Sequence, residues 1–148
     1  MFRLREATNP DLPSCLLIWQ SAVLATHQFL SDEHFREIKG YVETSYLPSA
    51  DLLVAVDADD IPHGFLGTTQ NHVDALFVHA GSHGRGIGSL LLEEFVKSRR
   101  EVTVDVNEHN LSGRAFYERL GFKVDSRSDV DDKGRPYPLL HMSWRRIR

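Results

Sequence analysis

Hydrophobic and polar positions change their period several times along the chain, and each change predicts one element. Apolar residues alternate with arginines over residues 2–5, which is the period of a short first strand. From Thr8 onwards the period becomes helical, and Thr8 and Asp11 have the spacing of a capping box. The predicted buried face of this helix consists of Leu12, Cys15, Leu16, Trp19 and Val23. A turn near Ser31 and a second short helix follow.

The centre of the chain contains three short apolar runs that predict strands, at residues 52–56, 64–69 and 73–78. The stretch "DADDIPHG" between the first two has the composition of a hairpin loop. A glycine-rich turn separates the third strand from a helix. The predicted inner face of that helix consists of Ile87, Leu90, Leu91 and Phe95.

The last third predicts a strand over residues 102–106, a helix over 111–120 that ends at Gly121, and two closing strands at 123–128 and 139–146. The complete order is β-α-α-β-β-β-α-β-α-β-β. It predicts a mixed α/β fold with one sheet, in which the strand–helix–strand section joins parallel neighbours by a crossover. The 148 residues fit one domain, and we see no repeat or linker.

Composition and charge narrow the class of protein. The formal net charge is −4, so no overall basic field would attract nucleic acid, and we expect the basic clusters at 97–100 and 144–148 to be solvated surface. The single cysteine, Cys15, excludes an internal disulfide and suits a core position in a reducing compartment. No signal pattern and no apolar run of membrane-spanning length occurs. We therefore expect a cytoplasmic protein with no membrane or nucleic-acid partner, either a monomer or a homodimer.

The glycine-rich turn lies between a predicted strand and a predicted helix and is a candidate anion site. Three glycines alternate with other residues in the run His83, Gly84, Arg85, Gly86, Ile87, Gly88. Unpaired N–H groups and the positive end of a helix favour an anion, and glycine lets the backbone approach it closely. A tight turn would need fewer glycines than three. The spacing matches neither a P-loop nor the dinucleotide fingerprint. The turn therefore favours a phosphate group but does not indicate which ligand carries it.

A second motif follows the next strand, and here the chain resembles the GNAT superfamily of N-acetyltransferases. In that family the acyl-CoA motif has the form Gln/Arg-x-x-Gly-x-Gly/Ala, which residues 83–88 match except for His83. The family's next motif is matched by Asn110, Ala115, Phe116, Tyr117, Gly121 and Phe122. The segments "ATHQFL", "VDVNEHN" and "GRPYPLLHM" also resemble the small bacterial YjaB-type branch of that superfamily.

The resemblance implies an acetyl-CoA-dependent N-acetyltransferase that moves the acetyl group directly to a primary amine, a protein lysine, N-terminus or small molecule, in a ternary complex. The sheet would splay at its centre, with the backbone of Leu76, Phe77 and Val78 holding pantetheine and polarising the acetyl carbonyl. The loop of residues 83–88 would bind the pyrophosphate, and Arg85 would add charge to the phosphates. Asn110 would bind the cofactor or simply cap its helix.

Two further roles follow for side chains. A lysine-like amine has a pKa of about 10.4, so a base must take its proton; the candidates are Asp74, Asp105 and His27, with His72 beside them. The resemblance assigns Tyr117 as the proton donor to the leaving thiolate, with core filling as the other reading. His141 is expected to be structural or to line the acceptor site. We expect acceptor contacts from His27, Phe29, Leu30 and the segment "GRPYP". The acidic pair at residues 32–33 suits either a cationic acceptor or the start of a helix.

Other functions remain open at this point. A catalytically silent acyl-CoA-binding or sensing module would also use these motifs, and His83 favours it. A nucleotide phosphate binder would compete with ATP rather than with CoA. We expect no metal, because the eight histidines are scattered and one cysteine supplies no zinc set.

Overall fold

The computed structural model describes residues 1–147 and contains a seven-stranded sheet in the order β1-β2-β3-β4-β5-β7-β6. The strands are β1 (Arg3–Glu6), β2 (Asp51–Val56), β3 (Pro62–Thr69), β4 (His72–Val78), β5 (Glu101–Asn107), β6 (Lys123–Ser128) and β7 (Leu139–Arg145). The helices are α1 (Leu12–Thr26), α2 (Asp32–Tyr41), α3 (Leu47–Ser49), α4 (Ile87–Val96) and α5 (Leu111–Arg119). A π-helical turn, Val42–Tyr46, joins α2 to α3, and two 3-10 turns lie at Asn9–Asp11 and Ala80–Ser82. None of these helices is long and apolar enough to cross a membrane.

The predicted mixed α/β order is confirmed, and so is the crossover. All neighbouring strands are antiparallel except β4 and β5, which are parallel and are joined through α4. The β4–β5 pairing is limited to His72 with Thr103 and Val73 with Val104. Beyond these pairs the two strands separate, although β4 continues to Val78 and β5 to Asn107. The sheet therefore opens at its centre, and the splayed sheet that the resemblance predicted is confirmed.

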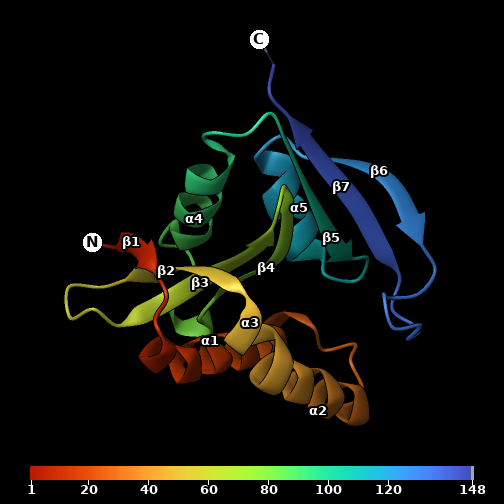
Figure 1. Ribbon diagram of the computed structural model, residues 1–148. Coiled ribbons are helices and arrows are strands. Elements are labelled where there is room, and N and C mark those ends of the chain that lie inside the picture. The colour runs from red at the N-terminus through yellow and green to blue at the C-terminus, as the bar shows by residue number, and fades with distance from the viewer. Residues whose placement is uncertain (148) are drawn as a thin grey trace.

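The sheet carries a hydrophobic core on each face (Figure 1). Helices α4 and α5 cover one face, and α1, α2 and α3 cover the other. The alternation of side chains along a strand separates the two cores, so that Val54 and Phe65 face α1 while Ala55 and Leu66 face α4. Cys15 lies in the α1-side core, where burial raises the pKa of its thiol to about 12.

The start of α1 differs from the expectation in one detail. Thr8 leads into a 3-10 turn, and the α-helix begins at Leu12. The Asp11 carboxylate accepts hydrogen bonds from the Thr8 N–H (2.8 Å) and hydroxyl (3.1 Å). Arg5 donates to both oxygens of Asp11 at 2.7 and 3.0 Å, which lowers the pKa of that carboxyl to about 2.

The predicted inner face of α4 was wrong at one position. Leu90 is 38% exposed, while Leu92 is buried at 1% together with Ile87, Leu91 and Phe95. Helical periodicity alone allows either leucine to border the apolar stripe. The sheet and α5 contact the side that carries Leu92, and this packing decides between them.

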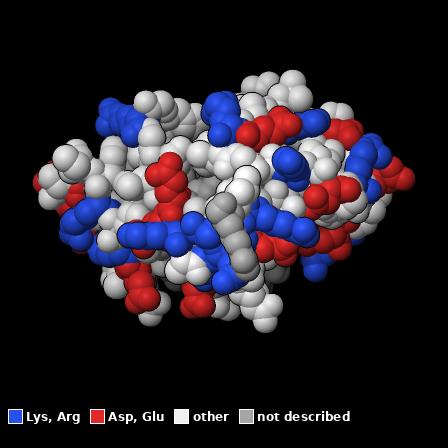
Figure 2. All heavy atoms as spheres, turned by 90° about the horizontal axis from the view of Figure 1, so that it is seen from above, with Lys and Arg blue, Asp and Glu red and all other residues white. Residues whose placement is uncertain are grey.

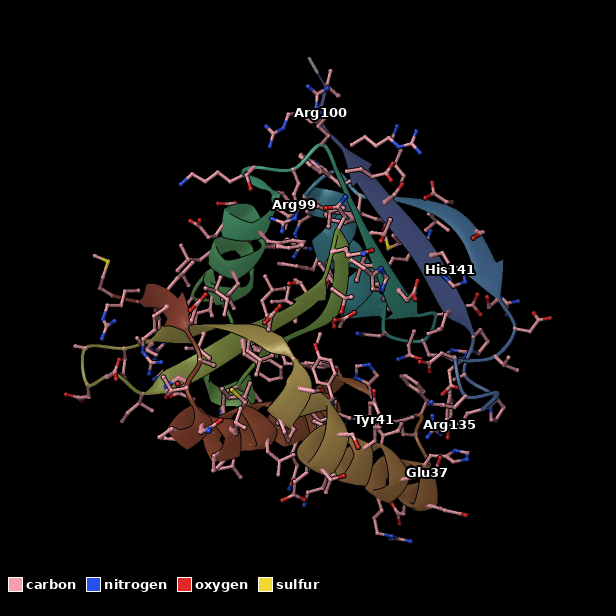
Figure 3. The ribbon with its side chains drawn as sticks, viewed as in Figure 1. Glu37, Tyr41, Arg99, Arg100, Arg135 and His141 are labelled. Atoms are coloured by element: carbon pink, nitrogen blue, oxygen red, sulfur yellow. The ribbon has the colours of Figure 1, made fainter. Side chains whose placement is uncertain are left out.

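The basic clusters are not simply solvated surface. The Arg146 guanidinium donates to the Val96 and Lys97 carbonyls at 2.8 and 3.1 Å, and so satisfies the C-terminal end of α4. Arg99 donates to the Phe95 carbonyl at 2.8 Å and lies 3.8 Å from the centre of the Phe95 ring (Figure 3). Acidic and basic side chains are interspersed on the face seen from above (Figure 2).

Candidate active site

The separation of β4 from β5 opens a cavity of about 550 Å³ that we call the strand-gap cavity. Strand geometry directs polar backbone groups into it, because successive residues of a strand point their amides to opposite sides. The His79 N–H donates to His63 on β3 at 2.9 Å, so Leu76 and Val78 direct their amides at the gap. The lining comprises residues 73–78, 82–84, 86–89 and 104–107, Asn110, Ser112, Gly113, Phe116, Tyr117, Arg119, and from α1 Ala22, Thr26 and His27.

Each glycine of the turn at residues 83–88 has its own physical reason. Gly84 and Gly86 have φ angles of 82° and 76°, which favour glycine, and nothing lies within 4 Å of a Cβ built on either. A Cβ on Gly88 would lie 3.3 Å from the Phe116 ring, so Gly88 lets α4 approach α5. The first hydrogen bond of α4 runs from Leu90 N–H to Gly86 O, which leaves the N–H groups of residues 87–89 free within the helix. This open backbone at a helix N-terminus fits a pyrophosphate.

The two side chains of the turn differ in their placement. The His83 Nε2 lies 3.2 Å from the Val78 carbonyl and closes the loop onto the end of β4. His83 lines the strand-gap cavity, whereas Arg85 is exposed and lies outside that lining. Arg119 on α5, which the sequence analysis did not select, does line it.

The α5 side of the cavity carries the predicted tyrosine. Tyr117 is 8% exposed, and burial raises the pKa of its hydroxyl above the ordinary value of 10.0. Phe116 lines the cavity as well, and its ring lies 5.1 Å from the ring of Tyr117. Asn110 caps α5 by accepting from the Gly113 N–H at 3.1 Å, and it also lines the cavity; its role toward the cofactor stays a prediction.

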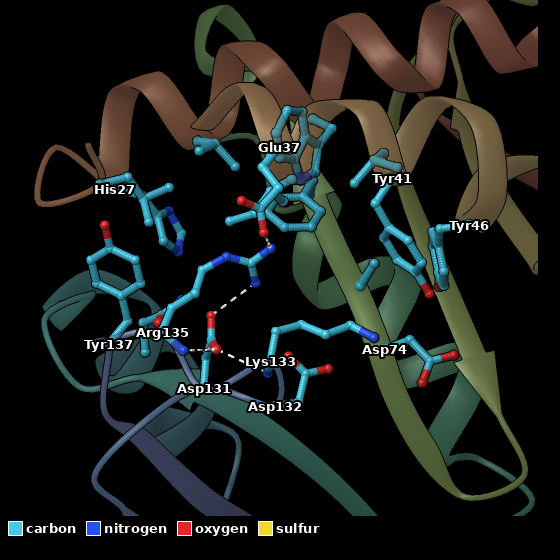
Figure 4. Close-up of a pocket in the computed structure, with 18 of the residues that line it drawn as sticks. His27, Glu37, Tyr41, Tyr46, Asp74, Asp131, Asp132, Lys133, Arg135 and Tyr137 are labelled. Carbon is cyan, nitrogen blue, oxygen red and sulfur yellow. Dashed lines mark hydrogen bonds and ion pairs between the residues drawn. The ribbon is translucent and has the colours of Figure 1, made fainter. Parts of the chain in front are cut away.

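A second cavity of about 480 Å³ lies on the α1–α2 side of the sheet; we call it the aromatic cavity (Figure 4). Its lining comprises Trp19, Val23, His27, Leu30, Glu37, Ile38, Tyr41, Val42, Tyr46, Phe65, Asp74, Ala75, Phe77, Asn107, residues 131–133, Arg135, Tyr137 and Leu139. Five of these residues also line the strand-gap cavity: His27, Asp74, Ala75, Phe77 and Asn107. The two cavities therefore meet at the open part of the sheet.

The loop between β6 and β7 closes one wall of the aromatic cavity. Arg135 pairs with Glu37 on α2 and, at 3.2 Å, with Asp131 (Figures 3 and 4). The Tyr137 hydroxyl lies 2.5 Å from Nδ1 of His34 and accepts from the Ser31 N–H at 3.2 Å. This loop contains the segment "GRPYP", which was expected at the acceptor site, and the structure brings it to α2.

The other acceptor-side expectations have mixed outcomes. His27 and Leu30 line the aromatic cavity, whereas Phe29 is absent from that lining and packs against the rings of His27 and Tyr137. Residues 32–33 form the first turn of α2, which Ser31 caps, and they do not line the cavity. The helix-start interpretation of that acidic pair is therefore favoured.

His27 lies at the junction of the two cavities in a defined tautomer. Its Nδ1 is 2.7 Å from the Thr26 hydroxyl, which donates its only hydrogen to the Ala22 carbonyl at 2.8 Å. Nδ1 therefore carries the hydrogen and donates to Thr26, which leaves a lone pair on Nε2. Burial lowers the pKa of His27 to about 4, so the ring is neutral at pH 7.

Asp74 lies at the same junction and is exposed. Its carboxylate accepts from the Thr69 hydroxyl at 2.6 Å. Burial first, and the negative charge of Asp74 second, raise the pKa of the neighbouring Tyr46. A Cβ on Gly67 would lie 1.9 Å from the Tyr46 hydroxyl, so glycine at this position makes room for that side chain.

Asp105 lines the strand-gap cavity but not the aromatic cavity. Its carboxylate lies 2.7 Å from Nδ1 of His141 and 3.8 Å from Nε2 of His72. The other nitrogen of His141 lies 2.6 Å from the Ser128 hydroxyl. His141 and His72 line neither cavity, so the expectation that His141 borders the acceptor site is not supported.

Comparison with known proteins decides the family. The sequence matches the description "Acetyltransferase (GNAT) domain" over residues 23–145. The chain belongs to the GNAT family. Like the family as a whole, this GNAT acetyltransferase takes its acetyl group from acetyl-CoA. An enzyme is thus favoured over the silent acyl-CoA-binding module.

This GNAT protein has similar relatives over its whole length. It is 41% identical to a protein named peptidyl-lysine N-acetyltransferase YjaB from Salmonella typhimurium, over 97% of this chain and 99% of that protein. The solution structure of apo-form YjaB from Escherichia coli has a TM-score of 0.92 at 40% identity and covers 97% of both chains. The PaiA N-acetyltransferase of Thermoplasma acidophilum, solved with coenzyme A, shares the fold at a TM-score of 0.78 and 20% identity, covering 99% of both chains.

Proposed function

We propose that this chain is a single catalytic domain that acetylates the ε-amine of lysine side chains in proteins or peptides. The supporting observation is the meeting of two cavities at the open sheet. The strand-gap cavity offers a glycine cradle and strand amides to acetyl-CoA, and the aromatic cavity reaches the same junction from the opposite side. The names of the YjaB relatives favour peptidyl lysine among the amines.

The aromatic cavity suits an alkyl chain that ends in an amine. Trp19, Phe65 and Phe77 supply apolar walls, and a lysine stem buries its methylenes on such surfaces. The Asp74 carboxylate at the junction attracts the ammonium group. An acceptor lysine would therefore enter from the α2 side and place its nitrogen beside Asp74 and His27.

The amine must lose a proton before it attacks. With a pKa of about 10.4, deprotonation at pH 7 costs about 4.6 kcal/mol. His27, with its pKa of about 4, does not retain that proton at neutral pH. We assign to His27 Nε2 and Asp74 the task of accepting hydrogen bonds from the amine and passing its proton to water. Asp105, outside the aromatic cavity, is less well placed for this role.

Tyr117 serves as the proton donor to the leaving thiolate. Burial raises the pKa of its hydroxyl, so the phenol enters the reaction protonated and a free phenolate is disfavoured there. As the phenol gives its proton to sulfur it therefore takes one from the attacking amine or from water, and CoA leaves as the neutral thiol. Leu76 or Val78, whose amides face the gap, supplies the N–H that polarises the acetyl carbonyl.

The test measures CoA thiol release with acetyl-CoA and matched peptides that carry lysine, arginine or N-acetyl-lysine at one position. We expect release only with free lysine, and the acetyl group on its ε-nitrogen by mass spectrometry. Gly86→Val, which forces a β-branched residue to a φ of 76°, should weaken acetyl-CoA binding, and Glu94→Gln on the exposed side of α4 is the matched control. Release with small amines but with no lysine peptide would refute the peptidyl-lysine assignment.

A further inference from the structure

One of the four lysines of the chain already lies in the aromatic cavity. Lys133, on the loop between β6 and β7, lines this cavity, whereas Lys39, Lys97 and Lys123 line neither cavity. Figure 4 shows its side chain extending from the loop across the cavity, on the side of Tyr41 and Asp74. Its Nζ lies 5.8 Å from the centre of the Tyr41 ring, within the range of a cation–π contact.

The loop holds the backbone of Lys133 on both sides and leaves its ammonium free. Asp131 Oδ1 accepts from the Lys133 N–H at 2.9 Å and from the Arg135 N–H at 2.8 Å. Arg135 ties the loop to Glu37 on α2. Of the ion pairs with carboxylates among residues 1–147, none involves the Lys133 ammonium. No such bond therefore keeps it from moving along the cavity.

The neighbours of Lys133 lead to the junction of the two cavities. Tyr41 and Asp74 both act on the pKa of Tyr46, so these three side chains form one group along the cavity wall. Asp74 belongs to both cavities. The Lys133 ammonium, which lies beside Tyr41, therefore has a lined route to the point where an acceptor amine would meet the thioester.

We propose that Lys133 is an internal acetyl acceptor, modified by its own chain. This inference rests on the proposed lysine acetyltransferase function. The Lys133 nitrogen bonds to the carbonyl carbon of acetyl-CoA, and the carbon–sulfur bond breaks with its electron pair going to sulfur. Of the two protons that the ammonium loses, one goes to the thiolate and one to water. The products are CoA thiol and an amide that no longer carries a positive charge.

Acetylation of Lys133 would also change how the cavity receives other substrates. The free ammonium competes with an incoming lysine for Tyr41 and for the field of Asp74. The acetylated side chain loses that charge, so a cationic peptide meets less repulsion. Lys133 thereby acts as an occupant of the acceptor site until it is modified.

The first experiment incubates the purified protein with acetyl-CoA and no other acceptor, then measures acetylation of each lysine by peptide mass spectrometry. Lys97 and Lys123 report the uncatalysed background, because they lie outside both cavities. We expect Lys133 to exceed that background by roughly tenfold or more, with a rate constant independent of enzyme concentration. A level equal to the background, or an observed rate constant that rises in proportion to enzyme concentration, would overturn the inference.

A second readout needs no acetyl-CoA. An amine-reactive reagent labels Lys133, and a lysine peptide in excess should lower the labelling of Lys133 relative to that of Lys97, because reagent consumed by the peptide slows both sites equally. The arginine version of the peptide is the control for charge alone. Labelling of Lys133 that no lysine peptide slows would contradict its place in the acceptor route.

The thiol-release assay, run on the same samples, separates the two proposals. If lysine peptides release thiol but Lys133 stays unmodified, this inference fails and the proposed function stands. If Lys133 is acetylated but no peptide reacts, the inference stands and the peptide acceptor is wrong. If neither reaction occurs, both are overturned.

Discussion

The neutral state of His27 predicts a loss of stability in mild acid. Burial lowers its pKa from 6.5 to about 4 in the folded protein, while the unfolded chain keeps the ordinary value. Above pH 6.5 the ring is neutral in both states and the stability is fully present. Between pH 6.5 and 4 the unfolded state binds a proton that the folded state does not, so the unfolding free energy falls as pH falls.

The magnitude follows from these two pKa values. Linkage between proton binding and folding lowers the unfolding free energy by about 2 kcal/mol at pH 5 and by about 3 kcal/mol at pH 4, relative to pH 7.5. We choose pH 5 for the test because the ion-paired Asp11, with a pKa lowered from 3.8 to about 2, stays ionised there in both states. With an ordinary urea slope, 2 kcal/mol corresponds to a midpoint shift of roughly 1 M.

The assay compares urea unfolding at pH 7.5 and pH 5 for the wild type, His27→Gln and the control His109→Gln, whose side chain is exposed. We expect the pH-induced shift to shrink by roughly 1 M in His27→Gln and to remain in the control. The comparison within each variant removes any change in basal stability. Equal shifts in all three proteins, or an NMR titration of His27 centred near 6.5, would refute the reasoning.

Three further predictions concern single contacts. Tyr117→Phe should lower turnover by roughly 10²-fold with little change in acetyl-CoA affinity, measured by steady-state kinetics and calorimetry; an unchanged kcat would exclude the donor role. Gly67→Ala, which places a Cβ 1.9 Å from the Tyr46 hydroxyl, should lower the unfolding free energy by about 1–3 kcal/mol, measured by thermal unfolding. Adding Tyr46→Phe should recover part of that loss, and no recovery would argue against the clash. Arg146→Ala should cost about 1–2 kcal/mol by removing the bonds to the end of α4, whereas Arg145→Ala breaks only an exposed pair with a neighbouring strand and should cost under about 0.5 kcal/mol; equal losses would contradict the capping role.

The order of elements was predictable because it rests on local chemistry. Periodicity placed every strand and long helix to within a few residues, and Ser31 and Gly121 mark helix ends through their own backbone and side-chain geometry. The glycine turn was equally visible, since positive φ angles at Gly84 and Gly86 are a property of the residues themselves. The π-helical turn at Val42–Tyr46 gave no such local signal.

The candidate site was predictable only in part, because its residues come together from distant segments. The two sequence motifs selected the loop at residues 83–88 and Tyr117, which both line the strand-gap cavity. They could not show that Arg119 borders the cavity and Arg85 does not, because neighbouring packing decides where those long side chains lie. Tyr41, Tyr46 and Lys133 were missed for the same reason, since each belongs to a surface-like stretch in the sequence.

The sequence by itself determined the succession of strands and helices, the backbone of the glycine-rich turn at residues 83–88 and the family of the chain, because these depend on residues close together along the chain. Only the tertiary structure decided where the pairing of β4 with β5 ends, the meeting of the two cavities and the neutral state of His27. The pKa of a histidine depends on all the atoms that exclude water from it. Those atoms come from helices, strands and loops whose distance in space no local pattern records.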